Sequence, residues 1–303
     1  MAETTQSGLP ETKQKTPPAP ALLGGGKRKR EGSDVKSAPG SAQHASAQHA
    51  SNVIVDCGWG RLLFAQTFAD HKPLIEALRA EAADTRDIAF YVNDPHVLLA
   101  QAPQELFLDP SHTYRLDLDA YEPDGREPVG FDIRPLASTA DAEAVNLIYA
   151  KRGMVTVQPG FFGEKAQAPL LTYLVAVEAG TGRVVGTVTG VDHVAAFNDR
   201  ERGASLWCLA VEPTAASPGV GEALVRRLAE HYKARGAAYL DLSVMHDNEQ
   251  AIALYEKLGF ERIACFAVKR KNPINEPLFI GPAGEADFNP YARIIVDEAR
   301  RRG

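Results

Sequence analysis

The spacing of hydrophobic positions divides residues 130–268 into alternating strands and helices. Apolar runs and two-residue alternation predict strands at Phe131–Pro135, Thr172–Glu178, Val184–Asp192, Leu206–Val211, Ala238–Val244 and Arg262–Val268. Apolar positions three and four residues apart predict helices at Ala140–Lys151, Glu222–Arg235 and Glu249–Leu258. The glycines of Ala179–Gly182 favour a hairpin turn between two of the strands. We therefore expect an α/β fold whose mixed sheet is antiparallel at the hairpin.

The rest of the chain divides by composition. Residues 1–51 are rich in Pro, Gly, Ser, Ala and Gln, so we expect a disordered tail. Residues 52–128 are expected to form a small α/β region that ends in a polar, turn-rich linker. Its predicted elements are strands at Val53–Val55, Arg61–Phe64 and Ile88–Val92 and a helix at Pro73–Ala82. Residues 129–270 then form the main domain, and 271–303 a C-terminal extension.

Charge and cysteine content narrow the possible functions. The chain has 33 Lys and Arg against 39 Asp and Glu, and the excess of basic residues is confined to its first fifty positions. The remainder is acidic, so we expect no nucleic-acid partner. The basic run Lys27–Arg30 is either a solubilising cluster or a site for an anionic partner or nuclear import. Three separated cysteines predict no disulfide and no metal site, and no apolar run is long enough for a bilayer. We expect a cytoplasmic protein.

The turn after Leu206–Val211 contains the first candidate site. Free amides at a helix N-terminus attract anions, and glycines let a phosphate approach the backbone. The same residues also suit an ordinary connection between a strand and a helix. The turn and the start of the helix consist of Ser217, Pro218, Gly219, Val220, Gly221 and Glu222.

The later helix 249–258 contains a second pattern. Asn248 is a capping residue, and Gly259 stands where a helix commonly ends. Apolar positions share one face at helical spacing, and Tyr255 lies on that face. Taken alone, a tyrosine at such a position is most often a core residue.

In order and spacing, these patterns resemble the acetyl-CoA half of the GNAT acetyltransferases. The matching residues are Val211-x-Pro213, Gly219-x-Gly221 and Asn248-x-x-Ala251-x-x-Leu254-Tyr255-x-x-Leu258-Gly259-Phe260. The resemblance implies a GNAT fold, with a mixed, mostly antiparallel sheet flanked by helices and with splayed central strands. It also implies an acetyl-CoA cosubstrate and an amine acceptor.

The resemblance assigns the cosubstrate contacts by position. The backbone of Leu209 and Val211 would pair with the pantetheine arm, and residues 217–222 would hold the pyrophosphate. Asn248 would contact the cosubstrate near its thiol, and Tyr255 would direct its hydroxyl at the sulfur. Ala216 replaces the Gln or Arg that usually opens the family's phosphate loop. We therefore expect weaker cosubstrate affinity.

A narrower resemblance is to the GNAT part of N-acetylglutaminylglutamine synthetases. It rests on the segments Asp87–Leu118, Thr187–Phe197, Val244–Asn248 and Asn272–Phe279. It implies that the acceptor is the α-amine of a glutamine dipeptide and that the product is an osmolyte. Those proteins continue into an ATP-grasp ligase, so residues 271–303 are expected to open such a domain. No ligase activity is assigned to this chain.

The expected chemistry is direct transfer from the thioester to the amine. Tyr255 is the expected acid for the thiolate, and a backbone amide near Leu209 is expected to stabilise the oxyanion. For the base we consider His193 and His246 first, with Asp192, Asp247 and Glu212 as alternatives. Cys208 suggests an acyl-cysteine route but suits a small core residue better. The main rival is a GNAT module that binds acyl-CoA without turnover and supports a ligase. A second rival function is that of a nucleic-acid-binding protein that uses Lys27–Arg30.

Overall fold

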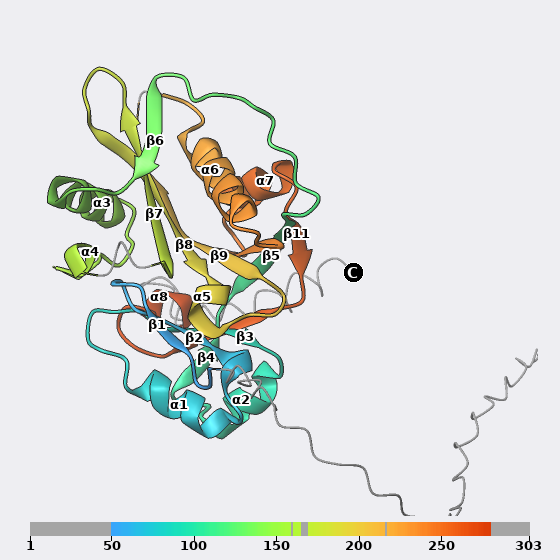
Figure 1. The fold of residues 1–303 in the computed structure, drawn as a ribbon. Helices are drawn as coiled ribbons and strands as arrows, with labels where there is room; N and C mark the ends of the chain where they lie inside the picture. The colour runs from blue at the N-terminus through green and yellow to red at the C-terminus, as the bar shows by residue number, and fades with distance from the viewer. Residues whose placement is uncertain (1–49, 159, 165–168, 216, 280–303) are drawn as a thin grey trace, which may run out of the picture. The chain divides into compact units, whose positions relative to one another are not determined.

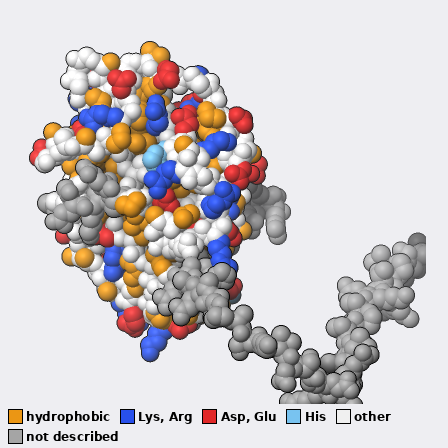
Figure 2. Space-filling view, viewed as in Figure 1, with side chains coloured by type: hydrophobic (Ala, Val, Ile, Leu, Met, Phe, Trp, Pro, Cys, Tyr) orange, Lys and Arg blue, Asp and Glu red, His pale blue; other side chains and the backbone are white. Residues whose placement is uncertain are grey.

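The computed structural model describes residues 50–158, 160–164, 169–215 and 217–279. All of them belong to one compact unit, Ala47–Gly303, and the predicted tail and most of the C-terminal extension lie outside the described residues. Within the described part, no helix is long and apolar enough to cross a membrane, and no cluster of His, Cys, Asp and Glu could hold a metal. On the face in Figure 2, basic and acidic side chains are interspersed.

The larger of two sheets has seven strands in the order β11-β5-β10-β9-β8-β7-β6. All neighbouring pairs in it are antiparallel except β9 and β10. Its strands are β5 (Ser111–Asp117), β6 (Phe131–Pro135), β7 (Leu171–Glu178), β8 (Val184–Asp192), β9 (Gly203–Val211), β10 (Tyr239–Met245) and β11 (Glu261–Ile263). The predicted mixed, mostly antiparallel sheet is therefore confirmed.

The smaller sheet has the order β1-β2-β3-β12-β4. Its strands are β1 (Ile54–Asp56), β2 (Arg61–Phe64), β3 (Ile88–Val92), β4 (Leu106–Leu108) and β12 (Phe266–Arg270). Strands β2 and β3 pair in parallel, as β9 and β10 do in the larger sheet. In both sheets a helix connects the parallel pair, and a second helix leads to a further strand.

Each sheet contains a strand from the other end of the chain. Strand β5 lies between β10 and β11, while β12 lies between β3 and β4. The division between the sheets therefore does not coincide with the predicted boundaries at residues 128 and 270. The predicted single strand Arg262–Val268 is wrong, because the chain turns at Cys265, whose amide donates to the Ile263 carbonyl, and passes from one sheet to the other.

Helices cover both faces of the larger sheet (Figure 1). α6 and α7 enclose one apolar core against β9 and β10, whereas α3 lies on the opposite face, where a second core also includes residues of the small sheet. α1 and α2 cover the outer face of the small sheet. The helices are α1 (His71–Arg79), α2 (Pro95–Gln101), α3 (Thr139–Lys151), α4 (Phe161–Glu164), α5 (His193–Phe197), α6 (Val220–Ala234), α7 (Glu249–Lys257) and α8 (Glu276–Phe279), with a 3-10 turn at Ala65–Thr67.

Glycine lets α6 approach β8 closely. A Cβ atom at Gly190 would lie 2.5 Å from the Tyr232 hydroxyl oxygen and 2.9 Å from Leu228 Cδ1. Both of these residues are buried. The close packing of α6 on β8 therefore depends on the absence of a side chain at residue 190 and not on the backbone freedom of glycine.

Gly190→Ala is expected to lower the free energy of unfolding by about 2 kcal/mol, because overpacking a close-packed core forces side chains out of their rotamers. Thermal denaturation measures this. Gly221→Ala is the matched control, since its added carbon would lie at an ordinary 3.6 Å from Val211. Equal melting temperatures for the two variants would contradict the expectation.

Candidate functional site

The two parallel strands of the large sheet separate along their length. β9 and β10 pair from Gly203 and Tyr239 to Leu206 and Leu242, and the described residues show no pairing between them beyond that point. The chain of β9 continues to Val211 and that of β10 to Met245. The expected splayed central strands are confirmed, and backbone groups on the free edge of β9 are left for another partner.

A bulge interrupts β9 where the strands separate. Thr187 of β8 is opposite Ala210, and Thr189 is opposite Trp207, so Cys208 and Leu209 together face one residue. Cys208 has a φ of 50°, which non-glycine residues rarely adopt. Such a bulge turns a backbone amide out of the regular ladder. The sequence showed no signal for it.

The start of α6, called the cradle below, has the backbone geometry that an anion site requires. Gly219 adopts a left-handed φ of 80° and precedes the helix, and its carbonyl accepts the amide of Ala223. The amides of Val220, Gly221 and Glu222 precede this first helical bond, so they are available to an anion. The corresponding helix of the small sheet, α1, begins instead at Asp70, whose carboxylate accepts the Lys72 amide. A carboxylate there repels phosphate.

Charged side chains surround the cradle. Glu222 accepts hydrogen bonds from Lys257 at 2.6 Å and from Arg226 at 2.8 Å. Arg226 and Arg126 also form ion pairs with Asp124 of the linker. The Glu222 carboxylate is thus neutralised by α7 and α6. Lys257 and Arg226 also line a cavity of about 600 Å³ between α6, α7 and β5, so cations lie on the outer side of the cradle.

Helix α7 reaches the same region through Leu254, the residue before Tyr255. A Cβ at Gly221 would lie 3.6 Å from Val211 and 3.9 Å from Leu254, so the cradle, the end of β9 and α7 meet. Asn248 caps α7 by accepting the Ala251 amide at 3.2 Å, as its sequence position predicts.

The Tyr255 ring is 5% exposed and packs against Phe260, with ring centroids 5.7 Å apart. Its hydroxyl forms no hydrogen bond with another described residue. Burial raises the pKa of Tyr255 above its ordinary value, so the hydroxyl keeps its proton at neutral pH. A group of this kind can act as an acid but not as a base.

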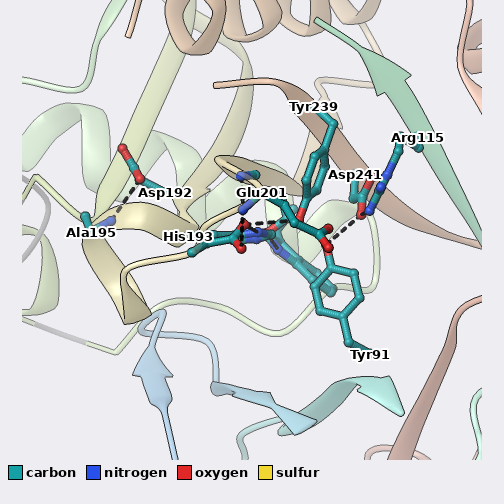
Figure 3. Close-up of polar contacts among 12 residues, drawn as sticks. Tyr91, Arg115, Asp192, His193, Ala195, Glu201, Tyr239 and Asp241 are labelled. Carbon is teal, nitrogen blue, oxygen red and sulfur yellow. Dashed lines mark hydrogen bonds and ion pairs between the residues drawn. The ribbon is translucent and has the colours of Figure 1, made fainter. Parts of the chain in front are cut away.

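The structure places His193 away from the separated ends of the strands. It is fully buried at the start of α5, beside the paired end of β9, and its Nε2 lies 3.0 Å from the Ser205 hydroxyl (Figure 3). Burial lowers the pKa of His193 to about 4. This position does not suit the base that the sequence suggested, because the packing of the small sheet against β9 encloses His193.

The other candidate bases have different surroundings. His246 is exposed, but its Nδ1 faces the Pro110 carbonyl at 3.0 Å, on the β5 side of β10. The Asp192 carboxylate accepts a hydrogen bond from the Arg235 guanidinium at 2.6 Å. Glu212 follows β9 and is bonded to Lys151 at 2.8 Å, which lowers its pKa and its strength as a base. Among these residues, His246 retains a free ring nitrogen near the open end of β10.

One backbone contact was not predicted. The Nε of Arg152, at the end of α3, donates to the Val211 carbonyl at 2.7 Å. Val211 was expected to offer its backbone to the pantetheine arm. Arg152 is exposed, and therefore its side chain can leave this carbonyl at little cost.

Comparisons with known proteins agree with this arrangement. Residues 143–260 match the acetyltransferase (GNAT) family. An acetyltransferase of Pectobacterium atrosepticum is 34% identical over 90 residues, which are 30% of this chain and 59% of that protein. The chain therefore spans less than two thirds of this curated relative.

Two solved structures are similar at low identity. A GCN5-related N-acetyltransferase from Sphaerobacter thermophilus is 19% identical, with a TM-score of 0.45 over 66% of this chain and 64% of that one. One from Kribbella flavida is 16% identical, with a TM-score of 0.46 over 73% and 90%. Residues 143–260 thus match the acetyltransferase (GNAT) family, and this part of the chain contains the two separated parallel strands of a GNAT fold.

Proposed function

We propose that this chain transfers an acetyl group from acetyl-CoA to an amine. One observation carries the proposal: the start of α6, the end of β9 after its bulge and helix α7 at Leu254 meet where β9 continues past its pairing with β10. GNAT proteins use acyl-CoA, generally acetyl-CoA, as cosubstrate. The region fits a long ligand with an anionic end, because it offers an unpaired strand edge and an anion cradle.

Each part has a role in the proposed transfer. The cosubstrate supplies the thioester. The amides of residues 220–222 bind its pyrophosphate, and the free edge of β9 at Leu209 and Val211 orients the arm. A backbone amide at the bulge stabilises the oxyanion, and Tyr255 donates a proton to the departing sulfur. His246 is the proposed base and Asp247 is the alternative, since both are exposed and neither forms an ion pair with a described residue.

Replacing Gly221 with aspartate tests the cradle. A carboxylate in the first turn favours the helix but repels a pyrophosphate, so we expect an unchanged melting temperature and acetyl-CoA affinity lower by about tenfold. Isothermal titration at low and high salt measures the loss, which should shrink as salt rises. Gly221→Ala is the control for the added carbon: it brings no charge, so its loss of affinity should be smaller than that of the aspartate variant and should not depend on salt. Equal affinities for all three proteins would exclude the cradle.

For the acceptor, we propose the α-amine of a glutamine dipeptide, with an N-acetylated osmolyte as product. The support is the sequence resemblance to the GNAT part of N-acetylglutaminylglutamine synthetases. A thiol-release assay with acetyl-CoA and a panel of amines that includes glutaminylglutamine tests it. A higher kcat/KM for unrelated amines would reject the dipeptide and leave acetyl transfer in place.

A second candidate is a module that binds acyl-CoA without turnover and supports an ATP-grasp ligase. The burial of Tyr255 and the ion pairing of Glu212 favour it, because both reduce the groups available for proton transfer. Titration with acetyl-CoA beside the thiol-release assay separates the two functions. Binding without thiol release for any amine would support the module.

A further inference from the structure

The linker that joins β5 to β6, residues 118–130, is held at both of its ends beside α6. Near the end of α6, the Lys233 ammonium donates to three linker carbonyls, and the shortest of these bonds is 2.6 Å to Tyr121. At the other end, the Gly130 carbonyl accepts the Ser217 hydroxyl at 3.5 Å, in the turn that precedes α6. The linker therefore follows α6 from its last turn back to the cradle.

Arg126 lies between these two attachments and reaches the first turn of α6. Its guanidinium is 3.6 Å from the Glu222 carboxylate, and the Glu222 amide is one of the three at the cradle. Only four residues separate Arg126 from Gly130, and four extended residues span at most about 14 Å. The Arg126 side chain is 65% exposed. It is thus kept beside the cradle with its guanidinium open to solvent.

Each carboxylate that Arg126 contacts also has another cation. Asp124 accepts the Nε of Arg126 at 2.6 Å and pairs with Arg226 as well. Glu222 accepts hydrogen bonds from Arg226 at 2.8 Å and from Lys257 at 2.6 Å. Three cations therefore share two carboxylates. Arg126 can leave both of them without leaving either unpaired, and exposed ion pairs of this kind are weak.

Open space adjoins this network. Arg226, Lys257 and Asp124 belong to the wall of the cavity of about 600 Å³. The Nε of Arg226 is buried and has no hydrogen-bond partner among the described residues, so the network retains an unused donor. The wall also contains carboxylates that form no ion pair with these cations in the described part of the chain, namely Asp117, Glu122 and Glu261. Because these carboxylates repel an anion, a phosphate is expected outside the cavity, on the Arg126 side of the cradle.

From these contacts we propose that Arg126 leaves Asp124 and binds a phosphate of the cosubstrate, so that the linker forms part of the acyl-CoA site. A guanidinium binds a phosphate through two parallel hydrogen bonds, and it stays charged at any working pH. The inference rests on the proposed acetyl transfer. It adds a binding residue from outside residues 143–260, the part of the chain that matches the acetyltransferase family.

Isothermal titration of the full chain with acetyl-CoA tests this role. Arg126→Met should bind about tenfold more weakly than the parent, as expected for the loss of a hydrogen bond to a charged group, and the loss should shrink as salt rises. Its melting temperature should not change, because Asp124 and Glu222 keep other partners. Arg79→Met is the control and should bind as the parent does, since it also removes an exposed arginine that pairs with two carboxylates.

Shortened ligands identify the phosphate. A tenfold loss that persists with dephospho-coenzyme A assigns Arg126 to the pyrophosphate, whereas a loss seen only with acetyl-CoA assigns it to the 3′-phosphate. Pantetheine has no phosphate and should bind the parent and Arg126→Met equally. An equal loss of affinity for pantetheine would overturn the inference, because it would show a general defect of the site.

Asp124→Asn provides a change of opposite sign. It removes the carboxylate that competes for Arg126, so the affinity for acetyl-CoA should rise about threefold. A fall as large as that of Arg126→Met, or equal affinities for the parent and Arg126→Met, would overturn the inference. In the latter case acetyl-CoA still binds, and the proposed function stands. If the parent itself binds no acetyl-CoA, the proposed function fails as well.

Discussion

Tyr255→Phe is expected to lower kcat by about 100-fold or more while acetyl-CoA binds with nearly unchanged affinity. General acid catalysis commonly contributes this much, and the substitution removes only the hydroxyl. The ring itself packs against Phe260 in the core of α6, α7 and β10, and the substitution keeps this contact. Stopped assays of thiol release give kcat, and titration gives the affinity.

The melting temperature of the Tyr255→Phe variant serves as a control for this result. Since the Tyr255 hydroxyl has no hydrogen bond to a described residue, its removal should leave the melting temperature unchanged or slightly higher. A variant with normal turnover would remove Tyr255 from the mechanism and would favour water or another group as the proton donor. A parallel loss of affinity and turnover would indicate a binding role instead.

Arg115→Met is expected to destabilise the fold by about 3 kcal/mol, a fall in melting temperature of roughly 6–12 °C for a protein of this size. Arg115 of β5 binds both oxygens of Asp241 on β10 at 2.8 Å and stacks on the Tyr239 ring at 3.7 Å. The Tyr91 hydroxyl donates to the same carboxylate at 2.6 Å (Figure 3). The Asp241 side chain is fully buried, so loss of Arg115 leaves a charge without its counterion.

The loss of stability in the Arg115→Met variant should depend on pH. Burial already raises the pKa of Asp241, against the opposing effect of Arg115, so the folded state takes up this proton more readily than an unfolded aspartate does. Stability from such a group is present at low pH and is lost as pH rises through the folded pKa. Without Arg115 the pKa rises further, and the deficit in melting temperature should be smaller at pH 5 than at pH 8. An exposed-pair variant, Arg79→Met, should show little change at either pH.

The sequence predicts the elements whose signals are local. The cap at Asn248, the turn at Gly219 and the apolar spacing of α6 and α7 each depend on residues that adjoin in the chain, and the structure has these elements where they were expected. Strand β5 was missed because its alternation is weak. Only Thr113, Tyr114 and Leu116 of its residues are buried, and the strand is held in place by β10, more than a hundred residues away.

The sequence did not predict the parts of the candidate site that depend on tertiary packing. His193 follows a strong strand and looks available, but only the folded chain shows that Phe64 and Tyr91 of the small sheet surround its ring. The left-handed φ of Cys208 also has no sequence signal, because cysteine seldom adopts it.

Each sheet contains one strand from the other end of the chain, β5 or β12, and this affects how the protein folds during synthesis. During synthesis, the segment through β4 emerges before the strand that will separate β3 from β4 has been made. Until then two strand edges stay open to any neighbouring polypeptide. Contacts between such distant segments also slow folding, because a long loop must close first. Folding yield should therefore fall with protein concentration, and co-expressed chaperones that shield nascent chains should restore it.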